Sequence, residues 1–126
     1  MSKRQCLSCG MITAVSIPEF NSTRAPQYCS KCDDDLLQQT DMSILEEDIA
    51  HHRETIPEAL RKLETLLNEA YAGYYSELYL VVGGGMIKHE ILAQLYFYQE
   101  QGYIRSYEAD KHNHGAVIVT IRNNTQ

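Results

Sequence analysis

The chain has no apolar run long enough to cross a membrane, no excess of basic residues and no tryptophan. A membrane span needs about 20 predominantly apolar residues, so the sequence predicts no membrane partner. The net charge of −6 argues against strong nonspecific attraction to nucleic acid, but it leaves room for a local basic patch. No apolar signal stretch follows Met1, so we expect a reducing, cytoplasmic location.

Cysteine is scarce too, but the four cysteines fall into two identical pairs. Cys6 and Cys9 form one C-x-x-C turn, and Cys29 and Cys32 form the other. Each such turn places two thiolates on one side of a loop, and two of them complete a tetrahedron around one zinc ion. Gly10 follows the first pair, where a metal-binding turn commonly needs positive φ.

The alternatives for these cysteines are a pair of disulfides or two redox sites. A reducing compartment disfavours disulfides, and a thioredoxin-like motif opens a helix after a strand, a setting that neither pair has. We therefore predict a β-rich structural zinc ribbon over residues 1–32. So short a unit buries little surface, and metal coordination would supply much of its folding free energy.

Inside the ribbon, the β-branched stretch 11–17 predicts a strand that Pro18 stops. Residues 33–42 are acidic and polar, and we expect them to be a linker, either irregular or partly helical. The three aspartates 33–35 at its start are interpreted as a solvated run rather than a metal site.

A second unit spans residues 43–126, and its clearest element is a helix. Thr55 and Glu58 have the spacing of a capping box, Pro57 suits the first turn, and Gly73 is a good stop. Between these signals, apolar residues recur at helical spacing on one face. The pattern predicts a helix from Ile56 to about residue 72.

The rest of this unit alternates strand and helix signals. Residues 78–82 are a continuous apolar run, as in a strand covered on both faces. A helical period follows over 86–101, and two strands are expected over 103–107 and 115–121, joined as a hairpin. The order predicts an α+β fold, in which two helices cover a small mixed sheet.

Three glycines, Gly83, Gly84 and Gly85, separate the buried strand from the second helix. Such a turn lets backbone N–H groups approach an anion, and the helix N-terminus adds partial positive charge. Lys88 in the first turn adds a full charge. The alternative is a purely structural tight turn, since neither the dinucleotide fingerprint nor the P-loop pattern is complete.

Three segments give this unit a family resemblance. His52–Leu60 looks like the motif H-G-x-[ST]-[VI]-x-E-A-L, and Val82–Gly85 is similar to a [HT]-G-x-G turn. Gly115–Ile121 is similar to a glycine-led final strand. From about Ile49 to Ile121 the chain resembles the Smr domain, the small MutS-related family of nucleic-acid-processing proteins.

The resemblance implies binding more readily than cleavage. Family members that cut nucleic acid carry L-D-x-H, where this chain has Ile49–His52 with Ala50 in place of the carboxylate. His52 carries over as an acid–base or phosphate-contacting group, and Gly83 and Gly85 carry over as the phosphate turn. Loss of one polar partner usually disables such catalysis, so a weak metal-dependent endonuclease is only a third hypothesis.

Local signals conflict over residues 43–53. Ser43 and Glu46 have capping-box spacing, which favours a helix, while the Smr resemblance implies a strand there and so a four-stranded sheet. His51 and His52 are adjacent and cannot easily share a metal. The other histidines are expected to be exposed polar positions, although three of them can in principle gather near an anion or metal: His89, His112 and His114.

The leading hypothesis is nucleic-acid binding, with RNA or a nucleic-acid-bearing complex favoured over duplex DNA. The glycine turn would hold a phosphate, and the ribbon would add its basic residues, namely Lys3, Arg4, Arg24 and Lys31. Tyr74 and Tyr75 are the best exposed candidates for stacking on bases. The alternative is a protein-interaction module that docks a protein partner through its ribbon and acidic surface.

Overall fold

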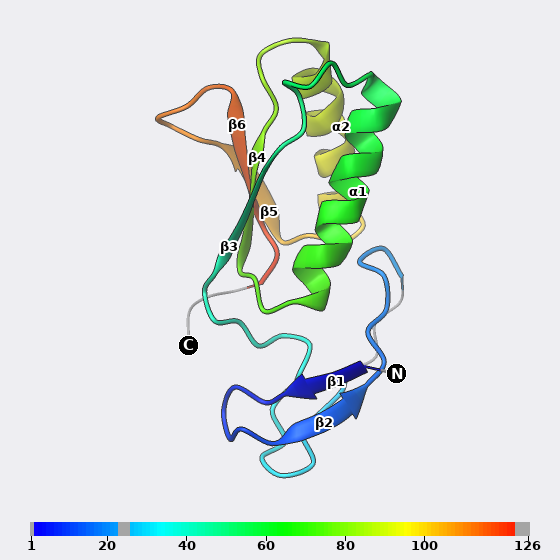
Figure 1. Ribbon diagram of the computed structural model, residues 1–126, viewed down its shortest axis with the longest axis vertical. Helices are drawn as coiled ribbons and strands as arrows, with labels where there is room; N and C mark the ends of the chain where they lie inside the picture. The colour runs from blue at the N-terminus through cyan, green and yellow to red at the C-terminus, as the bar shows by residue number, and fades with distance from the viewer. Residues whose placement is uncertain (1, 23–25, 123–126) are drawn as a thin grey trace.

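The computed structural model describes residues 2–22 and 26–122. Its elements are β1 (Ser2–Gln5), β2 (Ile12–Val15), β3 (Ile44–Asp48), α1 (Ile56–Ala72), β4 (Glu77–Val81), α2 (Met86–Glu100), β5 (Ser106–Ala109) and β6 (Ala116–Thr120). Both helices lie on one side of a four-stranded sheet, and a two-stranded sheet lies beyond one end of it (Figure 1). The predicted fold class, an α+β unit of two helices on a mixed four-stranded sheet preceded by a small β-rich ribbon, is confirmed.

The ribbon is built on an antiparallel pair of short strands, β1 and β2. The strand predicted over 11–17 is present but shorter, because the amide of Ser16 donates to the Gln27 side chain at 2.9 Å rather than to a neighbouring strand. Its partner β1 has the polar sequence Ser-Lys-Arg-Gln, which carries no strand signal, and it was not predicted.

The four-stranded sheet has the order β3-β4-β6-β5. β3 runs parallel to β4, while β6 is antiparallel to both β4 and β5. The helical interpretation of residues 43–53 is therefore wrong. The carbonyl of Ser43 accepts from the amide of Ser76 at 2.9 Å, and the strand that follows pairs with β4 over its full length. Long-range pairing outweighs the local capping signal here.

Helix α1 begins as predicted. The amide of Glu58 donates to the Thr55 hydroxyl, and the Glu58 carboxylate accepts from the amide of Thr55, which completes the capping box. The helix ends at Gly73. Four residues of the apolar face expected from helical spacing are buried, namely Leu63, Leu67, Ala70 and Tyr71, while Ile56 and Leu60 of that face are half-buried. Ala59 and Leu66 complete the buried side.

The chain after α1 follows the predicted order of strands and helices, except that one strand begins later than predicted. The strand predicted to begin at Tyr103 begins at Ser106. The chain turns at Gly102 (φ +79°), and the amide of Tyr103 donates to the carbonyl of Tyr98 instead of to a strand. This turn places Ile104 in the core instead of on a strand. β5 and β6 then form the predicted hairpin.

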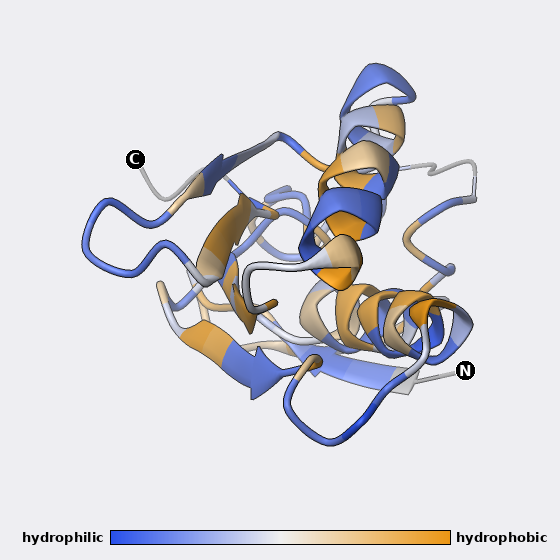
Figure 2. Ribbon diagram, turned by 90° about the horizontal axis from the view of Figure 1, so that it is seen from above, coloured by the Kyte–Doolittle hydropathy of each residue, from blue (hydrophilic) through white to orange (hydrophobic). Residues whose placement is uncertain are grey.

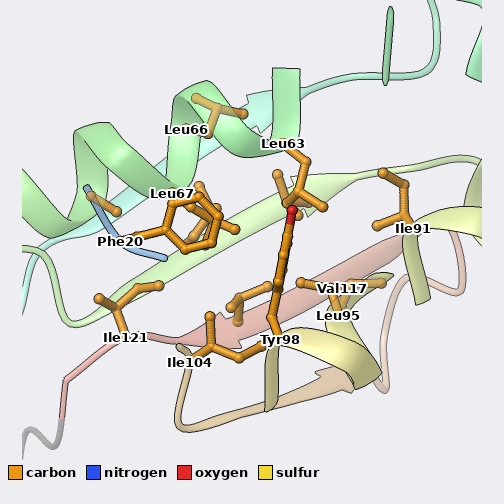
Figure 3. Close-up of a cluster of buried hydrophobic side chains, with 14 of the residues drawn as sticks. Phe20, Leu63, Leu66, Leu67, Ile91, Leu95, Tyr98, Ile104, Val117 and Ile121 are labelled. Atoms are coloured by element: carbon orange, nitrogen blue, oxygen red, sulfur yellow. The ribbon is translucent and has the colours of Figure 1, made fainter. Parts of the chain in front are cut away.

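The main core lies between the helices and the sheet (Figure 3). Seen from above, apolar segments of the helices and strands gather there, and long loops at the periphery are hydrophilic (Figure 2). Phe20 belongs to this core although it comes from the ribbon side of the chain. Its ring meets the Tyr98 ring edge-on, with centroids 5.0 Å apart. The core therefore ties the N-terminal segment to the α+β unit.

The predicted linker contains no helix or strand in residues 33–42, and it packs against both units. Leu36 lies in a small core with Cys6, Val15 and Cys29, while Leu37 lies in the main core. Next to them, the buried Arg122 donates to the carbonyls of Leu37, Ala70, Tyr71 and Tyr75. The connection is a packed joint. Within the described residues, no helix is both long and apolar enough to span a membrane.

Candidate metal centre and phosphate-binding turn

The four cysteines converge, and all are free thiols. Their sulfurs lie within 4.8 Å of one another, with Cys6 and Cys32 3.5 Å apart and Cys9 and Cys29 3.6 Å apart. A disulfide needs about 2.05 Å, whereas four thiolates about 2.3 Å from one zinc would be spaced by about 3.8 Å. The arrangement fits a tetrahedral four-sulfur site, so the cluster can hold a metal ion.

The two C-x-x-C turns have matching backbones. The residue after each pair has positive φ, +83° at Gly10 and +64° at Asp33. In each turn an amide donates back to the first cysteine: Gly10 to the carbonyl of Cys6 at 2.8 Å, and Asp33 to that of Cys29 at 2.9 Å. The glycine expected after the first pair is confirmed in this role, and an aspartate fills it after the second.

Hydrogen bonds from outside the pairs reach the sulfurs. The Gln39 amide nitrogen lies 3.3 Å from Cys6 Sγ, and its oxygen accepts from the amide of Leu7 at 2.8 Å. The Gln39 hydrogen bond is the main cause that lowers the pKa of the Cys6 thiol to about 6, against the opposing effect of burial. This hydrogen bond favours the thiolate form of Cys6, which is the form that binds a metal. Gln39 lies in the predicted linker and was missed by sequence reasoning.

The turn between β4 and α2 lies at the opposite end of the molecule from the ribbon (Figure 1). This turn borders a surface hollow. The hollow has a volume of about 310 Å³ and is lined by Ala50, His51, Val82, Gly83, Gly84, Gly85, Met86 and Ile87. The three predicted glycines therefore lie together on its wall. Gly83 has φ +69°, which favours glycine, whereas a Cβ added at Gly84 or Gly85 would meet no atom within 4 Å.

Helix α2 begins at this hollow without a side-chain cap, because its N-cap residue is Gly85. The amides of Val82 and Gly83 are already engaged by the carbonyl of Gly115, at 2.7 and 3.0 Å. The first amides of α2 have no partner within the helix, and they lie at its N-terminus, which carries partial positive charge.

Lys88 reaches across from α2 to the β5–β6 hairpin. Its ammonium donates to the carbonyl of His114 at 2.5 Å, next to the Gly115 backbone that contacts Gly83. The lysine thus holds the hairpin against the glycine turn and adds positive charge beside it. His89, His112 and His114 are exposed. In the described part of the chain, the cysteines are the only cluster of potential metal ligands found.

The histidine at the hollow is His51, and His52 is not among its lining residues. His51 Nε2 lies 3.8 Å from the position of a Cβ added to Gly83. Its Nδ1 lies 2.7 Å from Asp48, whose other oxygen accepts from the amides of Ala50 and His51. Burial raises the pKa of Asp48, but these hydrogen bonds outweigh it and the pKa is lowered. The turn after β3 thus brings the Asp48 carboxylate to the ring of His51.

Some of the basic and aromatic residues expected to aid binding are exposed, and others are packed inside the protein. Lys3 and Lys31 are exposed, and Arg24 lies outside the described residues. Arg4 is buried and engaged by backbone carbonyls, and Tyr74 packs against it, so neither faces solvent freely.

The other expected stacking residue, Tyr75, packs against the main core. The exposed tyrosines are instead Tyr28 and Tyr96, at 60% and 58% exposure.

These features define a small α+β domain joined to a four-cysteine ribbon that can hold a metal. The domain is similar to the Smr domain of Thermus thermophilus MutS2, known from a crystal structure. The TM-score is 0.54 and the identity 26%, over 63% of this chain and 99% of that one. The predicted Smr resemblance is confirmed, and it spans essentially the whole of that domain. No protein-family model and no curated protein matches the chain.

Proposed function

We propose that this protein is a zinc-stabilised nucleic-acid-binding protein of the cytoplasm that binds RNA, or a complex containing RNA, without cutting it. One observation carries the proposal: an uncapped helix N-terminus opens into a hollow lined in part by His51, and Lys88 lies in the first turn of that helix. The domain is similar to an Smr domain, and this resemblance implies a role with nucleic acid. A phosphate of the backbone fits the charge and size of such a site.

The lack of cleavage is proposed from the wall of the hollow. The side chain of Ala50 lies 3.7 Å from the position of a Cβ added to Gly83. In family members that cut nucleic acid, the position of Ala50 would carry a carboxylate. A methyl group cannot bind a metal ion or move a proton. Any residual cleavage would depend on the Asp48–His51 pair, since no other carboxylate–histidine ion pair is present among the described residues.

Zinc is the metal proposed for the ribbon, because four thiolates in a closed tetrahedral site are the ligand set that structural zinc prefers. The ribbon and the glycine turn lie at opposite ends of α1, a helix of 17 residues, which corresponds to roughly 25 Å. A nucleic acid that contacts both must span several nucleotides. Lys3 and Lys31 are the described basic residues of the ribbon free to contact it.

The test compares zinc-loaded wild type with Gly84→Glu and Gly84→Ala, using labelled single-stranded RNA, duplex RNA and duplex DNA. Gly84 has open space around it and no positive φ, so we expect both variants to fold. The Gly84→Ala variant keeps the site uncharged and should bind RNA as wild type does. The Gly84→Glu variant places a negative charge that repels phosphate and should weaken RNA binding by tenfold or more. Both affinities are measured at low and at moderate salt.

Equal affinity of the two Gly84 variants would remove the glycine turn from the binding site. Denaturing gels with magnesium or manganese report cleavage in the same mixtures. Cleavage by the wild type that is lost in His51→Ala would show that the protein is a nuclease and not only a binding protein.

A further inference from the structure

The side of the four-stranded sheet that faces away from α1 and α2 has no helix over it in the described part of the chain (Figure 1). Leu78, Leu80, Val117 and Val119 point towards the helices and are fully buried. Because side chains alternate along a strand, their neighbours point the other way. We call this surface the open face; it comprises Ile44, Glu46, Asp48, Glu77, Tyr79, Val81, Ser106, Glu108, Ile118, Thr120 and, at one end, the buried Ala116.

The open face is acidic at its edges and apolar at its centre. Register places Glu46, Tyr79, Ile118 and Glu108 in one row across all four strands, with an acid on each edge strand. Asp48 and Glu77 add to the acidic rim, and no lysine or arginine occupies any position of the open face.

Apolar side chains of the open face remain accessible. Ile44 is 54% exposed, and Tyr79, Val81 and Ile118 are half-buried. The Tyr79 hydroxyl donates to Asp110 at 2.6 Å, which fixes the ring and adds another carboxylate beside it. An aromatic ring held in place beside an isoleucine is a surface suited to contact with another chain.

We propose that the open face docks a protein partner through a segment that is basic and partly apolar. Carboxylates at both edges repel nucleic acid and attract lysine or arginine, while Tyr79 and Ile118 offer apolar contact between them. Among residues 2–22 and 26–122, β3 pairs with β4 alone, so its outer edge has no strand partner there. An extended segment can therefore lie across the strands or add to this edge. The proposal does not depend on nucleic-acid binding at the glycine turn.

The probe is a short fluorescein-labelled peptide that alternates lysine with valine, with a glutamate–valine peptide as the control ligand. Fluorescence anisotropy measures its affinity for wild type and for Glu46→Lys/Glu108→Lys, in which the charges at the two edges are reversed. The matched variant is Glu64→Lys/Glu69→Lys, which makes the same change in net charge at exposed positions of α1. We expect the first variant to bind about tenfold more weakly or worse, and the second to bind nearly as wild type.

Hydrogen exchange with and without the lysine–valine peptide locates the contact, and protection should appear in β3, β4 and β6. Equal weakening in both double variants would reduce the binding to nonspecific charge attraction and overturn the proposal. Protection at the glycine turn or the ribbon would overturn it as well. Glu46→Gln/Glu108→Gln serves as the conservative variant if charge reversal impairs folding, and it should also weaken binding.

A second copy of this chain is the other occupant that the test distinguishes. Sedimentation velocity without peptide, over a range of concentrations, reports self-association. A dimer that disappears in Glu46→Lys/Glu108→Lys would assign the open face to self-association and overturn the proposal. A monomer at all concentrations, together with the peptide results above, is the expected outcome.

Discussion

The guanidinium of Arg4 lies over the ring of Tyr74, 4.1 Å from its centroid, and the Tyr74 hydroxyl donates to the carbonyl of Gln5 at 2.6 Å. The same guanidinium donates to the carbonyls of Leu36, Ala72 and Gly73. The last two are carbonyls at the end of α1, where a cation is favourable. A ribbon residue thus caps a helix of the α+β domain, and the two units form one packed body.

We expect Arg4→Met to lower the free energy of unfolding of the zinc-loaded protein by about 3 kcal/mol. Methionine replaces the stem but leaves three carbonyls without their donor, and unsatisfied buried groups each cost about 1–3 kcal/mol. Urea denaturation measures the loss. Lys3→Met is the control, since Lys3 is exposed on the same strand and should stay within about 0.5 kcal/mol of wild type. Equal losses of unfolding free energy in Arg4→Met and Lys3→Met would show that Arg4 does not hold the ribbon to the α+β domain.

The two phenylalanines of the chain offer a second matched pair. Phe20 is buried between Tyr98 and Tyr103, and Phe97 is 50% exposed. Phe20→Ala should destabilise the protein by about 3–5 kcal/mol because it opens a cavity in the main core. Phe97→Ala should cost about 1 kcal/mol or less. A small effect of Phe20→Ala in thermal or urea unfolding would mean that the N-terminal segment does not anchor to the core.

Gln39 is expected to tune metal binding. Gln39→Met removes the amide donor to Cys6, so the pKa of that thiol rises from about 6 towards its ordinary value. Metal displaces a proton from each thiol, so the pH at which half the protein is loaded should move upward. Affinity at neutral pH should fall roughly tenfold, as for other partners of metal ligands.

Competition with a chelator across a pH series measures both effects of Gln39→Met. Gln38→Met is the control, because Gln38 is exposed and next in sequence. An unchanged pH midpoint in the Gln39 variant would show that the contact to Cys6 does not act on the thiol.

Variants of the neighbouring residues His51 and His52 test whether the hollow is the RNA-binding site. His51→Ala should weaken RNA binding about threefold to tenfold, because it removes a ring fixed by Asp48 beside the glycine turn. His52→Ala should bind as wild type, since His52 lies outside the lining of the hollow. The reverse order of effects in anisotropy titrations would restore His52, the residue that the family motif assigns.

Several features could be predicted from the sequence because their signals are local. The cysteine spacing predicted one four-sulfur cluster, the Thr55–Glu58 box placed the start of α1, and Gly83–Gly85 marked a turn between strand and helix. Each depends on residues within a few positions of one another. The conflict over residues 43–53 could not be resolved in this way, because pairing with β4 is a long-range contact.

The sequence by itself determined the two units, their order and the chemistry of the metal cluster, because hydrophobic period, capping and ligand spacing are short-range properties. Only the tertiary structure decided which residues serve each site. It turned Asp48 back onto His51, brought Gln39 to Cys6 and buried Arg4 against the end of α1. These partners depend on how distant elements pack, and no pattern of neighbouring residues records that packing.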